Sequence, residues 1–259
     1  MKFATTAALA LAISVALGGC GGGGGNTQDD ALSAGSTDVF SVPEGVWGGT
    51  FDKGSFTAYQ ALVQEDGTYW VAYGNVADNA LAVSGFMQGT GIGKNGTFNS
   101  SDLRNYGAGG IWTSASLNAS FVPGASLNGS VITNLGTVGF NGTPGTAFNY
   151  NTPAIPANIA HTWDMHQLNG TATSVSITAD GVLTGTAGTC TITGTVVPSA
   201  SGKNLYDVTT QFGASCLPAN TTGTGIAIWQ AIPNSEKAQL IIAAVASDRS
   251  AGMALIGNR

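Results

Sequence analysis

Residues 56–74, which read FTAYQALVQEDGTYWVAYG, contain the pattern that decides the fold. Two apolar segments, 56–64 and 68–74, flank the pair Asp66-Gly67. Apolar runs of this length that are bounded by turn residues are typical of β-strands. An Asp-Gly pair between such runs favours a two-residue type I′ hairpin, because this turn needs positive φ at both central positions. The stretch therefore predicts an antiparallel hairpin.

The same pattern continues along the chain at intervals of about ten residues. The other expected strands are 81–87, 111–121, 126–132, 162–168, 174–178, 190–197, 205–212, 225–231, 239–246 and 251–256. Further turn signals are Asn95-Gly96, Asn128-Gly129, Asn141-Gly142, Asn169-Gly170 and Asp180-Gly181. This spacing predicts an all-β fold, a hairpin-rich antiparallel β-barrel or sandwich.

Three landmarks occur twice in the same order, about 110 residues apart, which indicates an internal repeat. They are Trp47 and Trp163, Asp66-Gly67 and Asp180-Gly181, and Gly93-Lys94-Asn95 and Gly202-Lys203-Asn204. We therefore expect two related β units, residues 40–148 and 159–259. Residues 149–158 are rich in Pro and Asn and are the expected linker. A single closed barrel is the alternative.

The composition limits the classes of partner. Charged residues make up only 8% of the chain, whereas hydrophobic residues make up 43% and glycine occurs 39 times. Hydroxyl and amide side chains must therefore cover much of the surface. The net charge of −6 argues against nucleic acid as a partner, because nucleic-acid binding needs a basic surface.

The N-terminus has the three parts of an export signal. Lys2 is followed by the apolar run 7–17, which is too short to cross a bilayer, and then by Leu17-Gly18-Gly19-Cys20. This ending resembles the lipobox of bacterial lipoproteins. The resemblance implies a signal peptide over residues 1–19, cleavage before Cys20, and diacylglyceryl and N-acyl groups on Cys20. The alternative is an ordinary signal peptide followed by an unrelated cysteine.

Residues 20–39 begin with Cys20 and a run of glycines, and apolar periodicity starts only near Val39. We expect a flexible tether whose reach is roughly 25 Å. Several acyl chains would give a stable membrane anchor. Gly21 stands where an aspartate would indicate inner-membrane retention, which favours the outer membrane. The folded part can then face the periplasm or the cell exterior.

Cys190 and Cys216 remain once Cys20 is assigned to lipid. In an oxidising exported compartment an isolated pair favours a disulfide, which would close a loop of about 25 residues and stabilise the fold by roughly 3 kcal/mol. A metal or redox pair is the alternative, but further cysteines and the short CxxC spacing are missing.

Other motifs do not indicate catalysis, a metal or a further cofactor. Residues 91–96 match GxGxxG, but a strand-like segment follows where a nucleotide site needs a helix, so a hairpin is favoured. His161, Asp164 and His166 are close in sequence, yet residues five apart on a strand face opposite sides. Acidic residues such as Glu65 and Glu236 occur near expected turns and do not form a recognisable catalytic pair.

The five tryptophans are expected mainly in the core, although an aromatic-lined binding site is the alternative. They are Trp47, Trp70, Trp112, Trp163 and Trp229. Gly45-Val46-Trp47 resembles the Gly-x-Trp near the first strand of lipocalin-like barrels. Residues 251–259 resemble the closing strand of the barrels in transferrin-binding and factor-H-binding surface lipoproteins, which also share the lipidated cysteine and glycine-rich tether. The resemblance covers architecture and chain ends, not a binding site, and Cys20, the lipidated residue, is the one residue whose role it implies.

These observations favour a lipid-anchored envelope or surface lipoprotein that acts as a non-catalytic binding module. Its partner would be a protein or a small hydrophobic ligand. A structural lipoprotein that maintains the envelope is the alternative, and a hydrolytic enzyme is a third hypothesis. A hollow apolar barrel would indicate a hydrophobic ligand, whereas a filled barrel would indicate recognition by surface loops.

Overall fold

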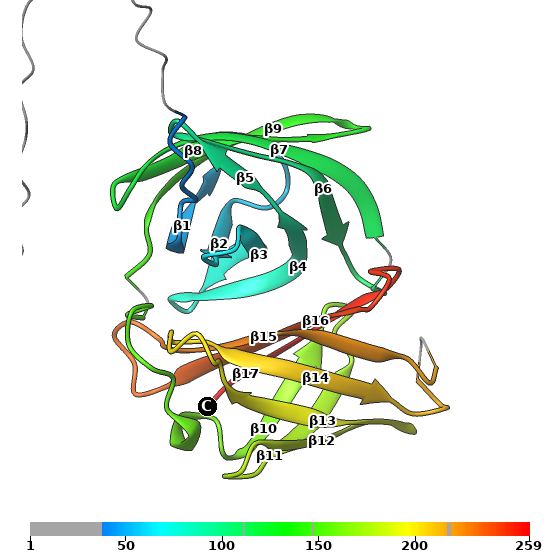
Figure 1. The fold of residues 1–259 in the computed structure, drawn as a ribbon. Coiled ribbons are helices and arrows are strands. Elements are labelled where there is room, and N and C mark those ends of the chain that lie inside the picture. The colour runs from blue at the N-terminus through cyan, green and yellow to red at the C-terminus, as the bar shows by residue number, and fades with distance from the viewer. Residues whose placement is uncertain (1–37, 111, 147, 217–218) are drawn as a thin grey trace, which may run out of the picture. The chain divides into compact units, whose positions relative to one another are not determined.

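A computed structural model describes residues 38–259, apart from residues 111, 147 and 217–218 (Figure 1). Antiparallel β-strands form this part of the chain in two groups, with the short 3-10 helix η1 (Pro156–Asn158) between them. The first group comprises β1 (Gly45–Phe51), β2 (Ala58–Val63), β3 (Thr68–Ala77), β4 (Ala80–Thr90), β5 (Ile92–Lys94), β6 (Thr97–Tyr106), β7 (Trp112–Val122), β8 (Ser126–Thr133) and β9 (Gly136–Pro144). The second comprises β10 (Thr162–Gln167), β11 (Ala172–Ile177), β12 (Val182–Ala187), β13 (Cys190–Pro198), β14 (Tyr206–Phe212), β15 (Thr222–Ala231), β16 (Ala238–Ala246) and β17 (Gly252–Asn258).

Each group closes into an antiparallel eight-stranded barrel, which confirms the all-β prediction and selects the barrel over the sandwich. In the first barrel β1 pairs with β9, and a short pairing of β4 with β6 closes the ring. We call this β4–β6 pairing the seam. Strand β5 is an additional strand that pairs with β6 outside the ring. In the second barrel β10 pairs with β17, and neighbours in sequence pair throughout.

The two barrels are related units, so the alternative of one closed barrel is wrong. Trp47 lies in β1 and Trp163 in β10, the first strand of each barrel. The two Asp-Gly turns both connect the second and third strands of their barrel. Both Gly-Lys-Asn triplets lie on the connection from the fourth strand of the barrel to the next strand of the ring.

Inward-facing side chains fill both barrels. Along β10 and β12 buried residues alternate with exposed ones, as expected for strands with one face toward a core. In the first barrel the inward-facing side chains are mainly aromatic and apolar, and they leave a cavity of about 40 Å³. Such a volume has room for only a few water molecules. The first barrel is therefore not a hollow container of the lipocalin kind.

A third apolar cluster joins the outer surfaces of the two barrels. Trp70 and Phe86, on β3 and β4, pack in one cluster with Ile241 and Ala243 of β16. Strand β16 is consequently buried along almost its whole length, with one face inside its barrel and the other against the first barrel. This arrangement explains why residues 239–246 read as a continuous apolar run.

The two Asp-Gly turns differ in type from the prediction. Only Gly67 and Gly181 have positive φ, at 82° and 85°, and the preceding aspartates do not. Each glycine N–H donates to the carbonyl three residues earlier, which makes a longer loop with a glycine bulge. Asp66 Oδ1 accepts the N–H of Thr68 at 2.8 Å, a local contact that stabilises this conformation.

The Asn-Gly pairs have different outcomes. Asn95 and Gly96 both have positive φ and form the predicted two-residue turn between β5 and β6. In contrast, Asn128-Gly129 and Asn141-Gly142 lie within β8 and β9, so the turn prediction is wrong there. A Cβ on Gly142 would lie 2.3 Å from the Tyr59 hydroxyl, so glycine is needed for close packing against the barrel interior.

Candidate functional site

The two cysteines of the second unit form the predicted disulfide. Cys190 begins β13, and Cys216 lies in the connection from β14 to β15. Cys20 lies outside the described residues, as do the signal peptide and most of the tether. Within residues 38–259, gaps excepted, no helix is long and apolar enough to span a bilayer.

The histidines do not form a joint site with the neighbouring aspartate. Trp163 and Met165 point into the second barrel, whereas Asp164 and His166 are exposed on β10, and His161 lies just before the strand. In the part of the chain that the structure describes, no three His, Cys, Asp or Glu residues are grouped to hold a metal ion.

The GxGxxG stretch is the hairpin formed by β5 and β6, as predicted. Its middle glycine lies against the incoming chain, because a Cβ on Gly93 would lie 1.7 Å from the carbonyl oxygen of Ser41. Glu65 is an exposed turn residue whose carboxylate lies 3.6 Å from Lys203 Nζ, and Glu236 is exposed between β15 and β16. The two acids therefore lie on separate connections, β2–β3 and β15–β16.

The five tryptophans, which were expected mainly in the core, are buried to different extents. Trp47 and Trp163 are each only 2% exposed and anchor the interiors of their barrels. Trp70 is buried between the barrels, and Trp229 packs partly against the second core. Trp112 is half-buried beneath the guanidinium of Arg104, 4.2 Å from its ring centroid.

A cavity of about 300 Å³ opens at one end of the second barrel, which we call the mouth. The turns after β10, β12, β14 and β16 surround it. The opposite end is closed by the linker, where Tyr206 Oη donates to the Ile155 carbonyl at 2.7 Å and Trp163 Nε1 to the Ile159 carbonyl at 3.0 Å. The second barrel is therefore open at one end only.

Small residues at inward-facing positions make the mouth hollow. Deeper in the barrel these positions hold large side chains such as Leu240 and Ile242 on β16. The next inward-facing positions along β16 are Ala244 and Ala246, which lie at the mouth. On the neighbouring strand β15, Gly223 also lines the mouth. The side chains shorten toward this end, so the core stops before the strands do.

The lining of the mouth carries no charged side chain. Gln167, Thr210 and Ser215 contribute amide and hydroxyl groups, while Phe212 and Met253 contribute apolar surface. Gln167 Nε2 donates to Thr173 Oγ1 at 3.3 Å, and Thr210 Oγ1 donates to the Gly223 carbonyl at 3.4 Å. A cavity of this kind can bind an uncharged molecule that has both polar and apolar faces.

The disulfide holds one wall of the mouth in place. It ties the β14–β15 connection to the start of β13, and both cysteines line the cavity. Backbone bonds assist, since Gly213 N–H donates to the Thr191 carbonyl at 2.9 Å and Cys216 N–H to the Gly213 carbonyl at 3.1 Å. The β14–β15 connection, which is not part of a strand, is thus fixed in place by a covalent bond.

The first barrel contributes another part of the wall. Gly109 and Gly110, in the connection from β6 to β7, line the cavity. Gly252 N–H donates to the Gly110 carbonyl at 3.3 Å, and a Cβ on Gly110 would lie 2.5 Å from the Gly252 carbonyl oxygen. The shape of the mouth therefore depends on how the barrels are joined.

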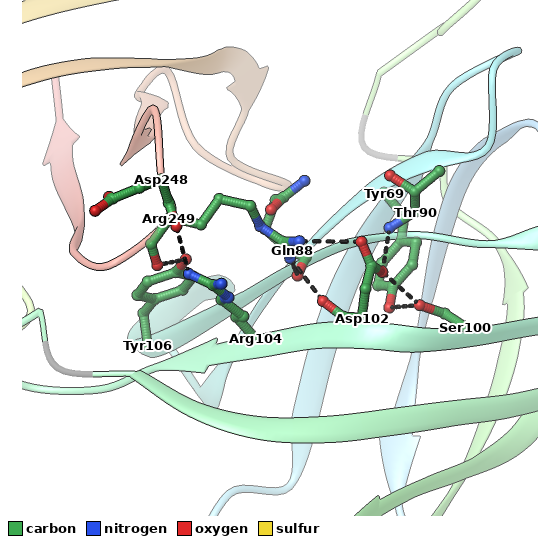
Figure 2. A network of polar contacts seen from close by, with 9 residues as sticks. All are labelled: Tyr69, Gln88, Thr90, Ser100, Asp102, Arg104, Tyr106, Asp248 and Arg249. Atoms are coloured by element: carbon green, nitrogen blue, oxygen red, sulfur yellow. Dashed lines mark hydrogen bonds and ion pairs between the residues drawn. The ribbon is translucent and has the colours of Figure 1, made fainter.

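Arg249 provides a polar connection between the barrels beside the mouth (Figure 2). It lies in the turn from β16 to β17, and its guanidinium extends to the seam of the first barrel. One nitrogen lies 3.0 Å from Asp102 Oδ2, and the other donates to the carbonyls of Gln88 and Asp102 at 2.7 and 2.8 Å. Tyr106 Oη donates to the Arg249 carbonyl at 2.9 Å. Both sides of the seam are thereby linked to the turn that lines the mouth.

Asp102 remains ionised in this network. Burial alone would raise the pKa of its carboxyl group, but the Thr90 N–H and the Ser100 hydroxyl donate to it, each at 2.9 Å. Together with the charge of Arg249, these donors hold the pKa of Asp102 below its usual value. Ser100 also accepts from Tyr69 Oη at 2.9 Å, and burial raises the pKa of Tyr69, so the phenol stays protonated as a donor.

Sequence reasoning found the disulfide but missed the rest of this site. Asp102 and Arg249 are 147 residues apart, and neither lies in a motif. The mouth is built from alanine, glycine, threonine and amide residues, whose chemistry gives no local signal.

A comparison with protein-family models finds none that matches the chain, and a comparison with curated proteins finds no match either.

Proposed function

We propose that the chain is a lipid-anchored lipoprotein of a bacterial cell envelope that binds an uncharged small ligand at the mouth of its second barrel, without catalysing a reaction. The observation that carries the binding function is the uncharged cavity of about 300 Å³ at the mouth. Its volume lies at the lower end of the range typical of small-molecule sites. The Leu17-Gly18-Gly19-Cys20 ending supports the anchor.

The packing of the barrels favours the mouth over the interior as the binding site. The cavity inside the first barrel has only about 40 Å³, which is too little for an acyl chain. The second interior is occupied by large aliphatic side chains and Trp163. A hydrophobic ligand of the kind that lipocalin-like barrels enclose is therefore not supported, and a ligand at the mouth is.

The lining specifies the chemistry of the ligand. Hydroxyl and amide groups can exchange hydrogen bonds with a neutral polar molecule, and Phe212 and Met253 can cover an apolar face. A charged ligand would lose its hydration without gaining a partner of opposite charge, which is costly. We therefore expect a neutral molecule such as an N-acetylated sugar to bind and an acidic sugar of similar size to be rejected.

A titration of the soluble chain, with Cys20→Ser, tests this proposal. N-acetylglucosamine should shift the amide NMR signals of the β14–β15 and β16–β17 connections, and glucuronate should not. Ala246→Leu, which fills the mouth, should abolish the shifts. Val182→Leu, on an exposed residue at the closed end, should leave them unchanged. If no neutral probe binds, or if Ala246→Leu has no effect, the mouth is not the site and the structural role in the envelope gains support.

A further inference from the structure

The segment that leads into the first barrel lies along β5. Asn95 N–H donates to the Val39 carbonyl at 2.9 Å, Val39 N–H donates to Asn95 Oδ1 at 2.9 Å, and Ser41 N–H donates to the Gly93 carbonyl at 3.3 Å. Asp38 is the first residue that the structure describes. The polypeptide that connects to Cys20 therefore leaves the fold beside the hairpin of β5 and β6.

Two large apolar side chains are exposed at this point. Phe40 is 68% exposed and Ile92 is 69% exposed. Phe40 forms a β-bridge with Lys94, and Ile92 lies two residues before Lys94 on the same strand. Because cross-strand partners and residues two apart share one face of a sheet, Phe40, Ile92 and Lys94 form one surface, which we call the β5 patch.

The charge of the β5 patch is balanced. Lys94 Nζ lies 2.9 Å from Asp38 Oδ2 and 5.8 Å from the centre of the Phe40 ring. The patch thus combines an aromatic ring, an aliphatic side chain and a lysine whose stem can lie along apolar surface while its ammonium stays in a polar layer. These are the features of surfaces that rest at the boundary between lipid headgroups and acyl chains.

We propose that the β5 patch lies on the lipid surface to which Cys20 anchors the chain; this inference rests on the proposed lipid anchor. Only 18 positions separate Cys20 from Asp38. If these residues form the flexible tether that the sequence predicts, a root-mean-square reach of roughly 25 Å gives the patch an effective concentration on the order of millimolar at the bilayer. A contact too weak to recruit a free protein is then sufficient to orient an anchored one.

Quenching by brominated lipid tests the contact. The full lipidated chain with Phe40→Trp is reconstituted in phosphatidylcholine vesicles whose acyl chains carry bromine near the headgroup. The matched control is Leu135→Trp, a residue 94% exposed in the turn between β8 and β9 at the opposite end of the same barrel. Each variant is compared with the unmodified sequence, which supplies the emission of the five native tryptophans.

The proposal predicts that most of the emission added by Phe40→Trp is blue-shifted and lost in brominated vesicles, whereas that added by Leu135→Trp is not. Equal quenching of both variants, or quenching of neither, would overturn it. The intact mass of the same samples separates the two claims. Lipid on Cys20 without quenching rejects the patch and keeps the anchor, whereas an unmodified Cys20 overturns the proposed function and the patch with it.

Discussion

Trp47 and Trp163 make the same contact in the two barrels. Each lies near the start of the first strand of its barrel, and each indole N–H donates to the carbonyl of the residue four positions earlier. The acceptors are Pro43 at 2.7 Å and Ile159 at 3.0 Å. Both bonds fix the chain where it enters a barrel. The repeated tryptophan of the sequence therefore has the same structural role in each barrel.

Replacing either tryptophan by phenylalanine should destabilise the protein to a similar extent. Trp47→Phe and Trp163→Phe each remove the indole donor from a buried carbonyl and leave a smaller ring in the core, which together cost about 2–3 kcal/mol. The Ile159 carbonyl still accepts the His161 N–H in the second variant, so its loss lies at the lower end of this range. Trp112→Phe, at a half-buried position without this bond, should cost less than about 1 kcal/mol. Urea unfolding measures all three. A large loss of unfolding free energy for only one of the two buried tryptophans would contradict the prediction that they are equivalent.

The carboxylate at the seam should make stability depend on pH. The pKa of Asp102 lies below its usual value in the folded state, so Asp102 stabilises the fold above about pH 4 and loses this contribution as the pH falls further. Its side chain is 46% exposed, so the contribution is at most about 1 kcal/mol. Unfolding free energies of the wild-type protein and Asp102→Asn should therefore differ most near pH 7 and converge in acid. A difference that grows in acid would contradict the assignment.

The disulfide should stabilise both the fold and the mouth. It joins residues 26 positions apart, for which the loss of chain entropy in the unfolded state gives about 3 kcal/mol. Replacing Cys190 and Cys216 by alanine should lower the thermal midpoint, and a reductant should lower the midpoint of the wild-type protein alone. If the reductant affects the double variant equally, it acts elsewhere. If it affects neither protein, the disulfide contributes nothing to stability.

The apolar cluster between the barrels should make them unfold together, as one cooperative unit. Ala243→Glu places an unpaired charge among the buried side chains between the barrels, which should cost more than about 3 kcal/mol and expose the linker to protease. Thr184→Glu, on an exposed position of β12, is the matched control and should be neutral. Equal protease resistance of the two variants would show that the barrels do not depend on this junction.

The sequence was sufficient where local chemistry sets the structure. The alternation along residues 162–168 and the Asp-Gly turns predicted hairpins correctly, although Asp66 was assigned the wrong turn type. Strands β9 and β12 were missed because threonine, asparagine and glycine occupy many of their positions and weaken the apolar pattern. Barrel closure supplies the hydrogen bonds that keep such segments extended.

Of the features that line the mouth, the sequence predicted only the Cys190–Cys216 disulfide. The mouth results from small residues such as Ala246 at the ends of strands, and a missing side chain gives no periodic signal. The contact of Arg249 with Asp102 depends on how two barrels meet, which no local pattern encodes. Closing the barrels and joining them brings together residues that the sequence keeps far apart.

The most direct test of the lipid-anchored account is the mass of the N-terminal peptide of the protein extracted from bacterial membranes. We expect the mature chain to begin at Cys20 and to carry a diacylglyceryl group on the cysteine sulfur and an acyl group on its amine. An unmodified Cys20, or a mature chain that begins elsewhere, would contradict the account.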